Sequence, residues 1–175
     1  MMNILRLLKA FLVGVTGLFI VITLFSLLIP STVQVSRATV ISNVTMARVN
    51  EQVGSLGNWK NWHPLFKSDS AAITFNASKT ACDIVYNGNH SRLTIKSTDS
   101  SVVQFDLMAK GENNIHNQII LTQLPGQQSI QVEWQALNKL RWYPWEKFYG
   151  IFIDKLTGPG YDAALAGLKS YLETK

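Results

Sequence analysis

The sequence predicts an α+β protein in which a curved, seven-stranded antiparallel sheet wraps around one long C-terminal helix, preceded by one N-terminal transmembrane helix. Three observations support this prediction. An uncharged apolar run occupies residues 10–29, apolar and polar residues alternate repeatedly between residues 33 and 138, and a helical apolar period extends over residues 140–172. A single apolar helix face of that length needs a curved sheet to cover it.

The run Ala10–Ile29 contains no charged residue and no proline. At about 1.5 Å per residue, a helix of this length spans the roughly 30 Å of hydrocarbon in a bilayer. A cleaved signal peptide is the alternative, but its apolar region would be shorter, and no small-residue cleavage site follows Ile29. We therefore expect residues 1–30 to form a short tail and a membrane anchor, and residues 31–175 to form one domain.

Basic residues are placed unevenly about this run. Arg6, Lys9 and the amino terminus precede it, whereas Arg37 is the one basic residue within ten positions after it. This imbalance favours a cytoplasmic N-terminus and an extracytoplasmic domain. The sequence thus predicts a single-pass membrane protein that contacts the lipid bilayer through residues 10–29.

Residues 33–42 alternate between apolar and polar side chains and are rich in β-branched residues, which predicts the first strand. Farther along the chain, Asn87-Gly88 and Pro125-Gly126 mark tight turns, and links this short join antiparallel strands. Apolar residues on one side of each strand predict one covered and one solvated sheet face. The six later strands are expected near residues 71–77, 81–87, 91–98, 101–110, 114–123 and 128–138.

Two helical segments complete the predicted domain. Ser42, Asn43 or Thr45 can cap a short helix after the first strand. In the C-terminal segment, Pro144 suits a first helical turn, and Gly158-Pro159 predicts a kink or a stop. The apolar stripe expected to cover the sheet is Trp145, Phe148, Tyr149, Phe152 and Leu156, with Glu146, Lys147, Asp154 and Lys155 on the opposite side.

Two aromatic motifs carry a resemblance to a known superfamily. They are Trp59-Lys60-Asn61-Trp62-His63-Pro64 and Trp142-Tyr143-Pro144-Trp145-Glu146-Lys147-Phe148, the second followed by Leu165, Leu168 and Lys169. Together with the order of elements, they make the chain resemble the START-like or SRPBCC helix-grip superfamily, and specifically its membrane-anchored bacterial polyketide cyclase/dehydrase type. The resemblance covers the whole chain, anchor included. It implies a helix-grip fold and a bacterial inner-membrane location, but it leaves function open, because this superfamily hosts binding, transfer and catalysis.

A helix-grip fold implies a space between the covered sheet face and the C-terminal helix. Phe148 and Phe152 lie one helical turn apart and should face Val132 and Trp134 across it. The two tryptophans of the first motif are expected to plug one end of the core or to gate a cavity mouth, with partners for their indole N–H groups. The candidate ligand-cavity residues are Trp59, Trp62, Phe105, Val132, Trp134, Trp145, Phe148 and Phe152.

Catalytic, metal and nucleic-acid sites have little support in the residues. His63, His90 and His116 show no spacing that pairs them with a nucleophile or assembles a metal site, so no catalytic residue and no metal ligand is assigned. His63 is expected to bond a loop carbonyl, and the sole cysteine, Cys82, to act as a small buried hydrophobe. The net charge of +5 is scattered along the chain, which disfavours nucleic acid as a partner. No cofactor is implied.

Three functions remain open from the sequence. The first is a membrane-tethered module that binds a hydrophobic small molecule or lipid between the sheet and the C-terminal helix. The second is a polyketide cyclase-like enzyme, which requires an ionisable group pointing into the cavity. Asp83, Asp106, Glu133 and Asp154 all fall on polar faces instead. The third is an interaction scaffold whose core is filled by its own aromatic residues. The volume and polarity of any cavity separate the three.

Overall fold

The computed structural model describes residues 4–111 and 113–174. Each of the seven predicted strands is present, with bounds within two residues of those expected. The elements are α1 (Ile4–Leu27), β1 (Thr32–Ser42), α2 (Met46–Val53), α3 (Leu56–Trp59), α4 (Pro64–Lys67), β2 (Ala71–Phe75), β3 (Ala81–Tyr86), β4 (Asn89–Thr98), β5 (Val102–Ala109), β6 (Ile115–Gln123), β7 (Ser129–Lys139) and α5 (Pro144–Glu173).

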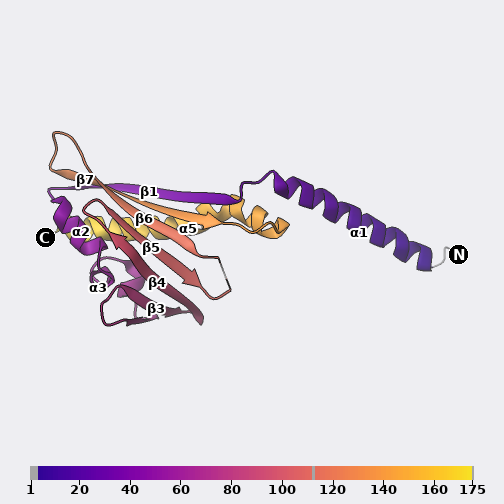
Figure 1. Ribbon diagram of the computed structural model, residues 1–175, viewed down its shortest axis with the longest axis horizontal. Helices are drawn as coiled ribbons and strands as arrows, with labels where there is room; N and C mark the ends of the chain where they lie inside the picture. The colour runs from indigo at the N-terminus through magenta and orange to yellow at the C-terminus, as the bar shows by residue number, and fades with distance from the viewer. Residues whose placement is uncertain (1–3, 112, 175) are drawn as a thin grey trace.

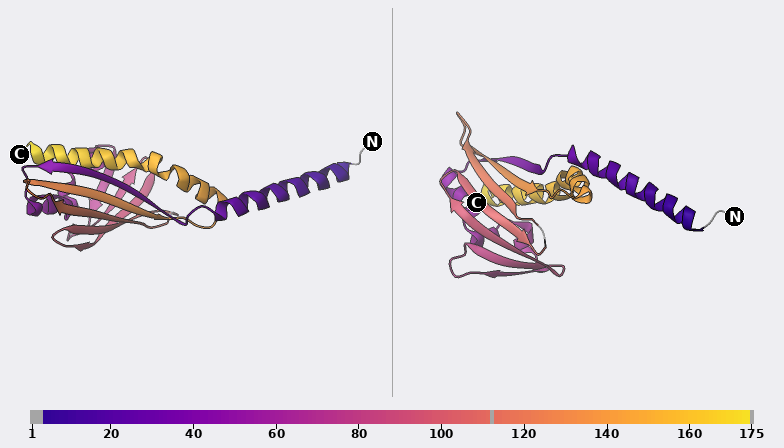
Figure 2. Two further views of the ribbon diagram at one scale, coloured as in Figure 1. Left: turned by 90° about the horizontal axis from the view of Figure 1, so that it is seen from above. Right: turned by 45° about the vertical axis from the view of Figure 1, so that its right-hand side comes forward.

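All seven strands form one antiparallel sheet in the order β1-β7-β6-β5-β4-β3-β2. The first strand therefore pairs with the last one, and the other neighbours are consecutive in the chain. Asn87 and Gly88 have φ angles of 50° and 77°, the left-handed values that a tight hairpin turn between β3 and β4 requires. A register shift between Ile95 and Ser97 bends β4, as a β-bulge does. The curved sheet follows one side of α5 (Figures 1 and 2).

The hydrophobic core lies between the sheet and the second half of α5. Leu165, Leu168 and Leu172 of α5 are buried there against inward-facing residues of the sheet such as Val103 and Ile130. The inward-facing residues predicted for β5 and β7 are thus buried or half-buried, whereas Asp106 of β5, predicted to be solvated, is 8% exposed. Three short helices, α2 to α4, close one end of the core. Thr45 caps α2, because its side chain accepts a hydrogen bond from the Arg48 N–H.

Helix α5 runs without interruption through Pro159, and its ribbon bends near the middle (Figure 2). The sequence predicted a kink or a stop here, and a kink is what forms, because proline removes one backbone hydrogen bond of the helix. Arg37 of β1 forms ion pairs with residues of α5 on both sides of Pro159. Its guanidinium lies 2.9 Å from Asp154 and 3.1 Å from Asp162. A Cβ on Gly158 would lie 2.1 Å from Arg37 Nη2, so a larger residue at this position would displace the guanidinium from its place between the two carboxylates.

The first half of α5 packs through a different face from the one predicted. Trp145 and Phe152 are 64% and 55% exposed, whereas Lys147, Gly150 and Ile153 are buried. The prediction that the aromatic stripe covers the sheet is therefore wrong. The physical reason is the contact of Gly150 with the Leu140 side chain, since a Cβ on Gly150 would lie 2.3 Å from a side-chain atom of Leu140. This contact turns the side of α5 that carries Lys147, Gly150 and Ile153 toward the domain, and the aromatic stripe points away from it.

Lys147, predicted to lie on the solvated side, is buried instead and joins α5 to the end of α1. Its Nζ donates hydrogen bonds to the Ile29 carbonyl oxygen at 2.9 Å and to Ser31 Oγ at 2.6 Å. The side chain of Ser26 in the last turn of α1 is also buried. The start of α5 and the end of α1 are thus held together.

Helix α1 extends away from the domain as a separate rod (Figure 1). In the described part of the chain, its 22 residues Arg6–Leu27 form the one helix that is long and apolar enough to cross a membrane. A signal sequence near an N-terminus has the same properties. Membrane insertion is therefore part of the function proposed below.

Candidate functional site

A cavity of about 530 Å³ lies between the sheet, the middle of α5 and the segment that contains α3 and α4. This volume falls within the range of roughly 300–1,000 Å³ that is typical of small-molecule sites. The strands contribute side chains two residues apart, such as Phe105 and Leu107 of β5, because alternate residues of a strand point to the same face. The cavity thus lies between the sheet and α5, where the sequence predicted a space.

Three aromatic rings form the rigid inner wall of the cavity. Trp59, Phe105 and Trp134 meet edge to face, with ring centroids 5.3 to 5.7 Å apart. The Trp59 indole N–H donates to the Val53 carbonyl oxygen at 3.0 Å. The Trp134 indole N–H donates to the Asn117 side-chain oxygen, also at 3.0 Å. Since the buried indole N–H groups already have partners, these rings offer a ligand only apolar surface.

His63 contributes a polar group to the cavity. Its Nδ1 accepts a hydrogen bond from the Leu65 N–H at 3.2 Å and so caps α4, which corrects the expectation that His63 bonds a loop carbonyl. Burial lowers the pKa of His63 to about 4, so the ring is neutral at pH 7. Because Nδ1 is an acceptor, the neutral ring carries its proton on Nε2. No described residue accepts a hydrogen bond from this Nε2–H.

Tyr161 of α5 is the second polar group of this kind. Its ring packs on Trp134 with centroids 5.1 Å apart, and burial raises the pKa of its hydroxyl to about 12. Among the described residues, the hydroxyl has no hydrogen-bond partner. The cavity therefore combines an apolar wall with two uncharged hydrogen-bond donors, and none of its described lining residues is Asp, Glu, Lys or Arg.

The sequence-predicted cavity residues separate into three groups in the structure. Trp59, Phe105 and Trp134 line the cavity, and their contact with a ligand stays a prediction. Trp62 and Val132 are buried beside the cavity without lining it, and the Trp62 indole N–H donates to the Gln52 carbonyl oxygen at 3.1 Å. Trp145, Phe148 and Phe152 lie on the exposed side of α5.

The expectation that Phe148 and Phe152 face Val132 and Trp134 is therefore wrong. Other residues of α5 reach the cavity instead, at Thr157, Gly160, Tyr161 and Ala163. Sequence reasoning missed them because the predicted apolar stripe ended at Leu156. The signal that was available is the density of glycine and alanine between residues 158 and 167, since small residues let a helix approach its neighbours closely.

A second group of ionisable side chains lies on the solvated face of the sheet. The carboxylate of Asp106 is 2.8 Å from His116 Nδ1 and 3.4 Å from Lys96 Nζ. Burial opposes ionisation of Asp106, but the hydrogen bonds and charges of His116 and Lys96 outweigh it and lower the pKa of the carboxyl. In the described part of the chain, no three metal-ligating side chains gather. We interpret this group as a local ion-pair network of the sheet.

Comparison with solved structures identifies the fold. A START superfamily protein from Mycobacterium smegmatis superposes with a TM-score of 0.61 at 12% identity, covering 81% of this chain and 98% of that chain. A Thalictrum norcoclaurine synthase point mutant, solved with a transition-state analogue, gives a TM-score of 0.62 at 11% identity, with coverages of 81% and 94%. Protein XoxI from Bacillus cereus gives 0.60 at 13% identity, with coverages of 80% and 95%.

No family model and no curated protein matches the sequence. At these low identities, the structural likeness shows the fold alone. The chain has the START-like helix-grip fold, with a seven-stranded antiparallel sheet and a long C-terminal helix, which confirms the fold that the sequence resemblance implied.

Proposed function

We propose that this protein is a membrane-tethered module that binds a neutral hydrophobic small molecule or lipid between the sheet and α5. The observation that carries this proposal is the cavity of about 530 Å³, with its aromatic wall and no described charged residue in its lining. A scaffold with a filled core would leave no such space. The anchor required for tethering is α1, which is long and apolar enough to span a bilayer.

The polarity of the cavity favours an uncharged ligand with one or more hydrogen-bond acceptors. A charged ligand would lose its hydration shell here without gaining an ion-pair partner. A ketone, ester or hydroxyl oxygen, by contrast, would satisfy the free donors of His63 and Tyr161. The rest of the ligand would contact apolar side chains.

The same two residues argue against acid–base catalysis as the main activity. An efficient general acid or base has a pKa near the working pH. The pKa of His63 is lowered to about 4 and that of Tyr161 is raised to about 12, so both groups are fixed in their neutral forms at pH 7. His63 Nδ1 is also occupied by the Leu65 N–H. These features favour binding over a cyclase-like reaction.

The register of the sheet relates the cavity to the anchor. Thr32, just after α1, pairs with Lys139. The neighbouring Asn138 pairs with Ile115, which in turn pairs with the cavity residue Leu107. These residues form one end of the sheet, and the cavity residue Leu107 lies at that end. A cavity placed at the end of the domain that carries α1 suits a ligand that is taken from lipid.

Gly160 allows the cavity to be filled without disturbing the fold. It lines the cavity and is exposed, and a Cβ added there would meet no atom within 4 Å. A Gly160→Phe variant should therefore occupy ligand space. Ala166 of the same helix is exposed and does not line the cavity, so Ala166→Phe is a matched control.

The test is native mass spectrometry of residues 31–175, whose hydrophobic core cluster contains no residue of α1. We expect the unaltered domain and Ala166→Phe to retain a small molecule that Gly160→Phe loses, with all three giving the same strand-rich circular dichroism spectrum. A folded, unaltered domain that carries no small molecule and takes up no added neutral lipid would refute the binding proposal.

A further inference from the structure

Exposed large apolar side chains are concentrated on one segment of the domain. Beyond residue 28, ten such side chains are exposed among the described residues, and seven of them lie between residues 142 and 156. Single exposed apolar residues are common on soluble proteins, whereas a contiguous group marks an interaction site. We call this group the aromatic face; it consists of Trp142, Trp145, Phe148, Tyr149, Ile151, Phe152 and Leu156.

The aromatic face has no means of turning into the domain. The opposite side of the same helix is already packed, with Gly150 against Leu140 and Val33 and with Lys147 hydrogen-bonded to the segment that follows α1. Rotation of the helix would break these contacts and expose the buried lysine partners. The aromatic face must therefore be covered, if at all, by something outside this chain.

The position of the aromatic face identifies what covers it. Lys147 holds the start of α5 against Ile29 and Ser31, the residues that follow the membrane-spanning helix. Figure 2 shows that α1 and the first half of α5 diverge from this common point. We propose that the aromatic face is a second membrane contact, embedded in the interfacial layer of the bilayer into which α1 inserts. This inference rests on the proposed tethering by α1 but not on ligand binding.

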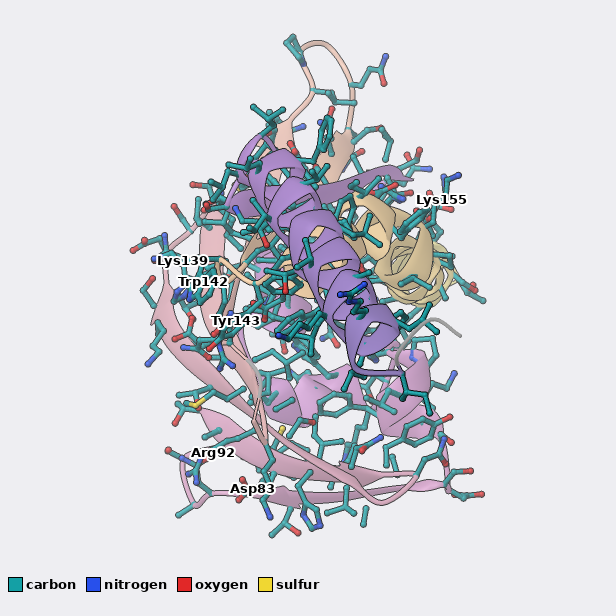
Figure 3. All side chains as sticks on the ribbon, turned by 90° about the vertical axis from the view of Figure 1, so that its right-hand side faces the viewer. Asp83, Arg92, Lys139, Trp142, Tyr143 and Lys155 are labelled. Atoms are coloured by element: carbon teal, nitrogen blue, oxygen red, sulfur yellow. The ribbon has the colours of Figure 1, made fainter. Side chains whose placement is uncertain are left out.

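The side chains around this point have the chemistry of a membrane interface. Trp142 and Tyr143 have ring centroids 4.9 Å apart, and Tyr143 stacks on Trp145 at 5.0 Å. Trp and Tyr favour the headgroup layer, because one end of each ring is apolar and the other is wet. Viewed from the end that carries α1, Lys139 lies with Trp142 and Tyr143 on one side of α1, and Lys155 lies on the other (Figure 3). These lysines suit anionic headgroups.

The distribution of tryptophans makes the proposal directly measurable. The chain has five, and none lies in α1. Trp59, Trp62 and Trp134 are buried in the domain, while Trp142 and Trp145 belong to the aromatic face. Brominated lipids quench only tryptophans that touch them. The full chain, reconstituted in vesicles of phosphatidylcholine with phosphatidylglycerol, should therefore show quenching by lipids brominated near the headgroup end of the acyl chain.

The double variant Trp142→Phe, Trp145→Phe should lose most of this quenching while still floating with the vesicles. Phe152→Glu should weaken it, whereas Val40→Glu, at an exposed apolar residue of β1 outside the aromatic face, should leave it unchanged. Quenching that remains in the double variant would report brominated lipid in the cavity, beside Trp59 and Trp134, and would support the binding proposal separately.

Three results would overturn the proposal. If the full chain does not float with vesicles, the tethering fails and this inference fails with it. If it floats but the double variant is quenched as strongly as the unaltered chain, the aromatic face does not touch lipid and the tethering stands. If Trp142 and Trp145 are protected and the chain self-associates in the vesicles, a second copy covers the aromatic face.

Discussion

The two halves of α5 differ in what they bury. The second half, after the bend at Pro159, follows the usual rule and buries Leu165, Leu168 and Leu172 in the domain core. The first half buries Lys147, Gly150 and Ile153 and presents a row of aromatic side chains outward. One helix thus buries its large apolar residues over its second half and exposes most of them over its first.

The difference shows that apolar periodicity identifies a helix but not the face by which it packs. The second half lies over a sheet far enough away to admit leucine side chains. The first half lies on Leu140 and on Val33 of β1 through Gly150, which is flanked on the buried side by Lys147 and Ile153. Large apolar side chains then point outward, an arrangement that is stable where lipid covers them.

The largest expected effect is on the free energy of unfolding, when a buried residue of α5 and an exposed one are each replaced by alanine. Leu168→Ala, in the second half of α5, should reduce the free energy of unfolding by about 2–5 kcal/mol, because it leaves a void in the core. Phe152→Ala, in the first half, should change it by less than about 1 kcal/mol. Urea denaturation of residues 31–175 measures both. Equal losses would show that the aromatic stripe packs on the sheet after all.

Acid should loosen the part of the domain around the cavity. The pKa of His63 is 6.5 when unfolded and about 4 when folded, so the folded state disfavours its protonation. The stability that depends on neutral His63 is present above pH 6.5 and is lost as the pH falls toward 4, by up to about 3 kcal/mol in total.

Urea midpoints measured between pH 7 and pH 4.5 report the stability lost through protonation of His63. Carboxylates such as Asp106, whose pKa is lowered, protonate mainly below that range and contribute little to it. His63→Asn is the matched control, since its side-chain oxygen can still cap α4 but does not titrate. A pH dependence as steep in His63→Asn as in the unaltered domain would show that another group is responsible.

Two glycines of the second half should respond in opposite directions to alanine. A Cβ on Gly167 would lie 2.3 Å from the Trp62 carbonyl oxygen, so Gly167→Ala should destabilise the domain by about 1–3 kcal/mol. Gly160 has open space around it, and Gly160→Ala should stabilise the helix by about 0.5–1 kcal/mol. Thermal unfolding of the two variants checks the difference, and a shift of the same sign in both would contradict the close approach at Trp62.

The sequence predicted the elements of the fold better than it predicted the site. Strand alternation, turn residues and capping residues are local signals. They placed all seven strands within two residues and predicted a short helix after β1, for which Thr45 is the cap among the three candidates. The wall formed by Trp59, Phe105 and Trp134 was also among the predicted residues. Tyr161 and Gly160 were missed, because their place at the cavity depends on the bend at Pro159 and on how closely α5 approaches the sheet. Such distances have no signature in apolar periodicity.

The short connection between α1 and β1 limits where the domain can work. Four residues, 28–31, separate the two elements, and even a fully extended chain of this length reaches only about 14 Å. The hydrogen bonds of Lys147 to Ile29 and Ser31 restrict the movement of this connection further. If α1 is inserted and the cavity binds a ligand as proposed, the domain cannot transfer that ligand to a second membrane facing its own. It must exchange the ligand with the leaflet next to it, or with a soluble carrier that binds to the domain.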